Sequence, residues 1–322
     1  MALDRVTRRF GTGSHIVRCG VLLMALAWMH TVPAAAPAEA QAKRISLVVG
    51  FAPGGTSSIV AHYLAEGLRT SLNTPVIVEN IAGAGGLVAA DFVKKQPPDG
   101  STLLVLSSTS LMKFPPTPEL MPITELATFE YVFVVAPTVR AKTLSEYFDQ
   151  ARAEPTLRTY ASPGAGTLSH LIAESLAQQT EVPLVAVHFR GSAPAATNVL
   201  GGHVAAGVLP MPDYVPLRDT VRAIAVGAKV RSKLLPEVPT ISESKYSAVP
   251  PGWMGLFAPQ HTPPEIIQML GAAARTAMGL DPQFLVDRGF QPAGSTPEEM
   301  ASIHQRDYDL WLPVLQKLGI TP

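Results

Sequence analysis

The sequence predicts an α/β protein built from two lobes that face each other across a cleft. Three observations lead to this prediction. Short apolar runs typical of buried strands alternate with stretches whose apolar residues recur at helical spacing. Two proline-rich passages, at 114–122 and 235–252, divide this alternation into two series. The length of 322 residues fits two domains, at roughly 150 residues for each domain.

The first series predicts three strands joined by two helices. The strands are expected at 45–51, 75–79 and 101–106, and the helices at 57–72 and 83–95. In the first of these helices Ile59, Tyr63 and other apolar residues recur three or four positions apart. Strands that alternate with helices in this way form βαβ units, so a parallel sheet is expected.

The second series repeats this pattern, and the end of the chain returns to the first unit. Strands are expected at 131–136, before Ser162, and at 184–188, 222–226 and 254–258, with helices at 143–153, 167–179, 193–200, 263–279 and 297–317. The predicted division is a signal segment at 1–42, a discontinuous first lobe at 43–133 and 252–322, and a second lobe at 134–251. Two passages between the lobes are typical of a hinge.

The first 42 residues have the pattern of a secretory signal peptide. Four arginines precede a short apolar run at 21–29, and a tail of small residues follows it. The apolar run is well short of the roughly 20 residues that are needed to span a bilayer. Cleavage after Ala40 or after Ala42 fits the pattern, and we expect the mature protein to be exported.

Composition excludes several classes of protein. The chain has 25 basic and 25 acidic residues, so no basic excess is present to bind nucleic acid. The apolar content of 47% argues against intrinsic disorder. Removal of residues 1–42 leaves 21 basic and 23 acidic residues and takes away Cys19, the single cysteine, which excludes a disulfide framework or a thiolate metal cluster. A slightly acidic protein must attract an anion through local groups.

Two glycine-bearing loops each join the end of a predicted strand to the start of a predicted helix. They are PGGT at 53–56 and SPGAGT at 162–167. Backbone N–H groups at the start of a helix favour a carboxylate or a phosphate, and ligands of open α/β sheets bind beyond the carboxyl ends of strands. Glycine also serves ordinary tight turns. The occurrence of two such loops nevertheless favours a pair of anion sites that hold an acid between the lobes.

The residues for enzyme chemistry are few. The histidines of the mature chain form no metal-binding pair on one helix, and the G-x-S-x-G pattern of an acyl-transfer nucleophile is absent. His170 lies one helical turn after the second glycine loop. Its position is compatible with a ligand contact, with the base of a hydrolase, or with simple packing. We expect no metal and no cofactor.

Several short segments occur in an order and spacing that resemble a known family. They are FAPGG at 51–55, VENIAGAGG at 78–86, DGSTLL at 99–104, YASPGAG at 160–166, HFRGSAPA at 188–195, LGG at 200–202, LPEVPT at 235–240, and Trp253 with Ala258 and Pro259. Together they resemble the periplasmic solute receptors of tripartite tricarboxylate transporters, also called Bug receptors. The resemblance covers nearly all of the chain after the signal segment.

The resemblance implies a type II periplasmic binding protein, and not an enzyme, that closes on a small mono-, di- or tricarboxylate. It also implies a monomer in the periplasm and membrane permease subunits as partners. The amides of Gly54 and Gly55 would receive one carboxylate, with loop 162–167 on the opposite wall. The candidate ligand-binding residues are Pro53, Gly54, Gly55, Thr56, Ser58, Ser107, Ser108, Thr109, Ser110, Ser162, Gly164, Gly166, Thr167, His170, Arg190, Gly191, Ser192 and Asn198.

The sequence departs from the family pattern near the first glycine loop. Ser58 and His62 stand where the family usually has an aspartate and an arginine, and positions four apart share one helix face. The usual pair either forms a salt bridge that this chain has lost as a unit, or its aspartate binds an ammonium group of the ligand. The second explanation would argue against an amino-acid ligand. Asn198 and Ala206 also replace common acidic residues, so we expect a cleft with few carboxylates.

Three alternative functions stay open at this point. The first is a receptor that reports ligand occupancy to a signalling partner without transport. The second is a hydrolase that uses His170 with a neighbouring serine, although no set of nucleophile, base and orienting acid is evident. The third is an orphan receptor with no ligand preference of its own, which the changes at Ser58 and His62 allow.

Overall fold

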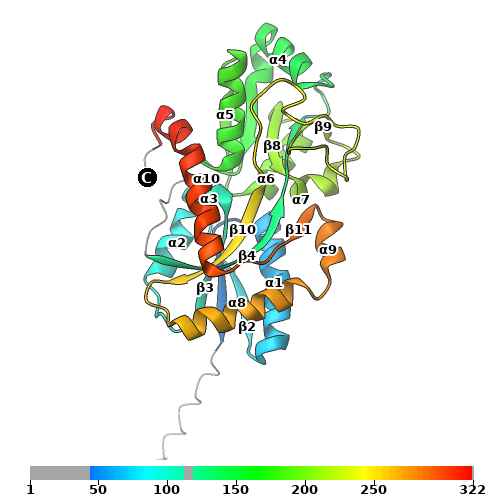
Figure 1. Ribbon diagram of the computed structural model, residues 1–322. Helices are drawn as coiled ribbons and strands as arrows, with labels where there is room; N and C mark the ends of the chain where they lie inside the picture. The colour runs from blue at the N-terminus through cyan, green and yellow to red at the C-terminus, as the bar shows by residue number, and fades with distance from the viewer. Residues whose placement is uncertain (1–43, 112–118, 321–322) are drawn as a thin grey trace, which may run out of the picture. The chain divides into compact units, whose positions relative to one another are not determined.

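The computed structural model describes residues 44–111 and 119–320, and the predicted signal segment lies outside them. Within these residues the strands form two sheets, one of six strands and one of five. Helices pack against both sheets (Figure 1). None of the helices in the described ranges is long and apolar enough to cross a membrane. Two sheets with flanking helices confirm the predicted α/β class.

The first sheet has the strand order β11-β4-β10-β3-β1-β2. Its strands are β1 (Ile45–Val49), β2 (Val76–Asn80), β3 (Thr102–Ser107), β4 (Leu120–Phe129), β10 (Gly252–Pro259) and β11 (Phe290–Pro292). Strands β1, β2 and β3 run parallel, as predicted. Strand β10 runs antiparallel to both of its neighbours, β3 and β4, and β11 runs antiparallel to β4. The parallel arrangement predicted for the first series is therefore confirmed, and the antiparallel strands that extend this sheet come from later parts of the chain.

The second sheet has the order β7-β6-β8-β5-β9. Its strands are β5 (Tyr131–Val135), β6 (Thr159–Ser162), β7 (Val185–His188), β8 (Ala206–Pro210) and β9 (Arg222–Gly227). Strands β6, β7 and β8 are parallel, whereas β5 is antiparallel to β8 and β9. This sheet is therefore mixed, and β5 follows β4 of the other sheet with only Glu130 between them.

Ten α-helices fall within the described residues. They are α1 (Thr56–Leu72), α2 (Leu87–Lys94), α3 (Ser108–Leu111), α4 (Leu144–Ala153), α5 (Leu168–Thr180), α6 (Ser192–Leu200), α7 (Met211–Tyr214), α8 (Pro264–Met278), α9 (Pro282–Val286) and α10 (Pro297–Lys317), with short 3-10 turns at Ala84–Gly86, Pro155–Arg158 and Val215–Leu217. Helix α10 has the predicted bounds because its start is strongly specified. Thr296 and Glu299 form a capping box around Pro297.

The chain changes sheet at Glu130, which alone separates β4 from β5. It changes back between β9 and β10. Buried apolar residues of both sheets, including Phe129 and Tyr131 on either side of Glu130, belong to one continuous core cluster. The rings of these two residues meet edge to face, with 5.4 Å between their centroids. The predicted limits of the lobes stay a prediction.

Helix α10 is fixed to the first sheet through a buried polar contact. The Trp253 indole Nε1 on β10 donates a hydrogen bond to Asp307 Oδ2 on α10 at 2.7 Å. Both residues are only 2% exposed. Arg306 Nη2 lies 3.0 Å from the other carboxylate oxygen, so the buried charge of Asp307 is paired. Trp253, one of the residues that carried the family resemblance, thus joins β10 to α10.

Candidate functional site

Loops that follow the parallel strands of both sheets line a cavity of about 170 Å³. From the first sheet come the loops after β1 and β2, and from the second sheet the loops after β6 and β7. The lining residues are Gly50, Phe51, Gly83, Ala84, Gly85, Pro163, Gly164, Ala165, His188, Phe189 and Arg190. We call this space the outer cavity. Because the carboxyl ends of parallel strands lie along one edge of a sheet, these loops meet at the place where α/β proteins bind ligands.

A second and much smaller space lies between the same two sheets and shares Phe51 and Pro163 with the outer cavity. Its volume is about 20 Å³, which is roughly the space needed for one water molecule. It is lined by Phe51, Thr56, Ser57, Ser107, Phe129, Pro163, Ser192 and Pro210. We call it the inner cavity. Helices α1 and α6 both begin at its wall, with Thr56 and Ser192 as their first residues.

The two sides of the cleft touch each other directly. The backbone N–H of Ala52, before α1, donates to the carbonyl oxygen of Arg190, before α6, at 2.9 Å. A hydrogen bond between backbone groups from the two sides requires the lobes to be close together. The molecule therefore has a closed cleft divided into an outer and an inner cavity.

A buried carboxylate, that of Asp213, lies at the start of both helices. The Thr56 hydroxyl donates to Asp213 Oδ2, and the Thr56 N–H lies 3.4 Å from the same oxygen. The Ser192 hydroxyl also bonds to Asp213. Asp213 is 7% exposed and belongs to α7, the short helix that follows β8. The expectation of a cleft with few carboxylates therefore overlooked this group.

Burial raises the pKa of Asp213 from 3.8 to about 6, although hydrogen bonds from Thr56 and Ser192 oppose the rise. The native state then holds a proton between about pH 4 and about pH 6 that the unfolded chain has released. We expect the free energy of unfolding to fall with rising pH across this window, by at most about 3 kcal/mol, and not to change further above it. Urea unfolding of the wild type and Asp213→Asn measures this, because the variant should lack that part of the pH dependence. Parallel curves for the two proteins would contradict the expectation.

The first glycine loop is placed as its sequence suggested. Gly55 is the N-cap of α1 and has an extended backbone, with φ −91° and ψ 179°. Pro53 and Gly54 before it are exposed, whereas Ser58 in the first turn is buried. His62, one turn further, is exposed. Ser58 and His62 therefore differ in exposure, and Ser58 is the one that lies near the start of the helix.

The second glycine loop is held by its own side chains. The hydroxyls of Ser162 and Thr167 both donate to the carbonyl oxygen of Gly164, at 2.9 and 2.7 Å. The backbone N–H of Gly166 donates to His170 Nδ1 at 3.0 Å. Gly166 has φ +69°, a conformation that favours glycine. His170 thus stabilises this loop, next to which it was predicted to contact a ligand.

The remaining candidates are divided between the cleft and other places. Ser107 lines the inner cavity and Arg190 lines the outer one. Ser108 accepts a hydrogen bond from the backbone N–H of Trp253 at 3.1 Å, and Asn198 donates to the Pro194 carbonyl oxygen of its own helix at 2.9 Å. Ser110 is buried without a hydrogen-bond partner among the described residues. The side chain of Thr109 lies outside the described part, and Gly191 is the N-cap of α6.

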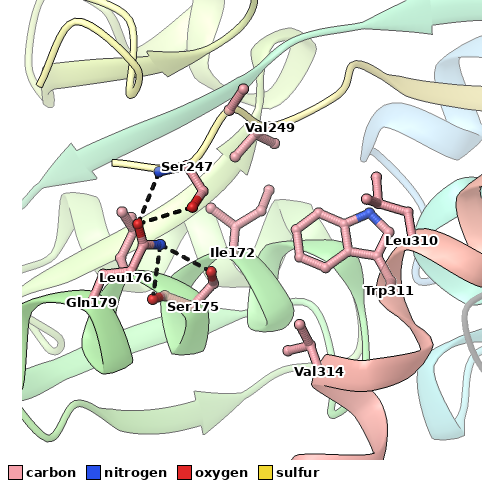
Figure 2. Close-up of a pocket in the computed structure, with 10 residues that line it drawn as sticks. Ile172, Ser175, Leu176, Gln179, Ser247, Val249, Leu310, Trp311 and Val314 are labelled. Atoms are coloured by element: carbon pink, nitrogen blue, oxygen red, sulfur yellow. Dashed lines mark hydrogen bonds between the residues drawn. The ribbon is translucent and has the colours of Figure 1, made fainter. Parts of the chain in front are cut away.

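A further pocket of about 160 Å³ lies away from the cleft, between α5, α10 and residues 247–249 (Figure 2). Gln179 joins two of its walls, since its Oε1 accepts from the N–H and the hydroxyl of Ser247 at 2.9 and 3.1 Å. Its amide nitrogen donates to Ser175. Trp311 and Val314 form much of the opposite wall. No charged residue is among those that line this pocket.

Two α/β lobes with a closed cleft at their strand ends define a periplasmic binding protein. Residues 60–320 match the family model described as the tripartite tricarboxylate transporter family receptor. The chain belongs to this family, which consists of solute-binding receptors and not of enzymes. It is also 31% identical to the protein BugT of Bordetella pertussis over 312 residues, covering 91% of this chain and 95% of BugT. The predicted family and class are thereby confirmed.

Two solved structures that resemble this fold contain carboxylates. A protein of R. palustris solved with adipate has a TM-score of 0.81 and 26% identity, covering 87% of this chain and 98% of its own. MatC of Rhodopseudomonas palustris, solved with bound malate, has a TM-score of 0.80 and 27% identity, covering 84% and 98%. Periplasmic binding proteins with carboxylate ligands are thus similar to this chain in both sequence and fold.

Proposed function

We propose that this protein captures a small organic carboxylate in the cleft between its lobes and delivers it to the permease of a tripartite tricarboxylate-type transporter. The outer cavity is the observation that carries this proposal, because loops from both sheets line it. The Arg190 side chain and the backbone of the glycine loops at 83–85 and 163–165 are the groups there that suit an anion. The adipate and malate bound by its structural neighbours support the same ligand class.

A thermal-shift screen of the mature protein tests the ligand class. Binding to the native state alone raises the free energy of unfolding by roughly 2.7 kcal/mol when the ligand is at 100 times its Kd. We expect at least one mono-, di- or tricarboxylate to raise the Tm, and Arg190→Gln to reduce that rise. Arg218→Gln, at an exposed position outside both cavities, is the matched control. A shift with sugars or cations and with none of the acids would contradict the proposal.

We further propose that the protein reaches the periplasm through removal of residues 1–42 and acts there as a monomer, with lobes close to the predicted limits. Mass spectrometry of the exported protein would report cleavage after Ala40 or Ala42. Recovery of the permease subunits with the ligand-loaded receptor, and not with the empty one, would support delivery. The family assignment supports this partner.

A further inference from the structure

The start of an α-helix attracts anions, and in this cleft the starts of two helices share one carboxylate from the chain itself. Asp213 accepts hydrogen bonds from Thr56, the first residue of α1, and from Ser192, the first residue of α6. The three residues come from both sides of the cleft and are all less than 10% exposed. The first residues of both helices thus already donate hydrogen bonds to a carboxylate of the chain, as they could to a carboxylate of a ligand.

Little space is left beside this carboxylate. The inner cavity, which Thr56 and Ser192 line, has a volume of about 20 Å³, which is roughly the space for one water molecule. A Cβ atom on Gly55 would lie 2.7 Å from Ser192 Oγ and 3.4 Å from Asp213 Oδ1. The contacts around Asp213 are therefore close even without a ligand.

The charge of Asp213 is also not neutralised by a neighbouring cation. Among the described residues, no ion pair includes Asp213. The groups that stabilise its carboxylate are hydroxyls and one backbone N–H. A second carboxylate brought into this buried place would meet a like charge at short range, which strongly disfavours its ionised form.

We propose that Asp213 is a specificity-determining residue that selects ligands with a single carboxylate. This inference rests on the proposed function. The carboxylate of the ligand binds in the outer cavity, beside Arg190, and the end of the ligand that points toward α1 and α6 is uncharged or donates a hydrogen bond to Asp213. This preference would set the chain apart from its structural neighbours that were solved with adipate and malate, because both of those ligands are dicarboxylates.

The test compares acids that differ by one charge but hardly in shape. Calorimetry at about pH 7.5 with the mature protein would use two matched pairs, succinate with succinamate and adipate with adipamate. For the pair of the better-fitting length, we expect the wild type to bind the monoamide at least tenfold more tightly than the diacid. Asp213→Asn should remove this preference or reverse it. Asp219→Asn, which changes an exposed aspartate six residues further on, should retain it.

The possible outcomes separate this inference from the proposed function. If the wild type binds the diacids as tightly as the monoamides, the inference is overturned while carboxylate binding stands. If Asp213→Asn folds and keeps the wild-type preference, the inference is also overturned. If no acid of either kind or of the wider screen binds, the proposed function fails and the inference fails with it. Should Asp213→Asn not fold, the affinity ratios of the wild type for the two pairs decide the question.

Discussion

Replacement of Gly55 by alanine is expected to weaken carboxylate binding by about 10- to 100-fold while both lobes remain folded. The backbone of Gly55 is extended, so alanine introduces no backbone strain. The added Cβ would lie 2.7 Å from Ser192 Oγ across the cleft, however, and Ser192 is held by its bond to Asp213. Overpacking of this kind costs about 1–3 kcal/mol, and each 1.4 kcal/mol corresponds to a factor of ten in affinity. The cost falls on the closed form alone.

Calorimetry with the acid that binds best in the thermal-shift screen measures this effect, and circular dichroism reports whether the fold is intact. Gly279→Ala is the matched control, because Gly279 lies at the end of α8 with φ −92° and a Cβ there would meet nothing closer than 3.6 Å. Small-angle scattering of the ligand-free proteins reports how far the cleft is closed, independently of any ligand. An unchanged affinity for Gly55→Ala would show that the contact between Gly55 and Ser192 is not part of the ligand-bound state.

Replacement of Trp253 by alanine is expected to lower the free energy of unfolding by about 3–5 kcal/mol. The change removes a large, almost fully buried side chain from between β10 and α10 and leaves a cavity. It also removes the indole N–H that donates to Asp307 at 2.7 Å. Since Asp307 is itself buried, the loss leaves a carboxylate with one partner fewer in a place that water hardly reaches.

Urea unfolding of Trp253→Ala and Trp253→Phe separates the two contributions. Phenylalanine keeps most of the packing but has no N–H to donate, so a loss of about 1–3 kcal/mol is expected for it. The difference between the losses of the two variants then measures the contribution of packing to the free energy of unfolding. A loss below about 1 kcal/mol for Trp253→Ala would mean that α10 is not anchored through β10. Neither variant lies at the cleft, so ligand affinity should change little in either.

The fold could be predicted from sequence where local signals specify an element. Helix α10 is bounded as predicted because its capping residues and its apolar face are both visible in the sequence. Strand β4 was missed because it contains Pro122 and polar residues such as Thr124 and Glu125. Its polarity has a tertiary explanation, since the buried Thr124 hydroxyl donates to the Ser295 carbonyl oxygen at 2.9 Å. The short strand β8, which contains Gly207 and Pro210, was missed as well.

The candidate site shows the same division between local and non-local signals. The glycine loops at 53–56 and 162–167 were evident from the sequence, because glycine at a junction of strand and helix is a local pattern. Asp213 was not found, because its position follows from β8, a strand that the sequence did not reveal. Knowledge of β8 would have placed Asp213 just beyond the carboxyl end of a parallel strand, where functional side chains commonly lie.

The order of strands in the two sheets also bears on when each sheet can form as the chain becomes available for folding. All five strands of the second sheet lie within residues 131–227, so this sheet needs no later part of the chain. In the first sheet β3 and β4 are joined only through β10, at Gly252–Pro259. Closure of such long-range contacts is slow. The N-terminal strands, although first to be synthesised, must therefore wait for nearly the whole chain before their sheet is complete.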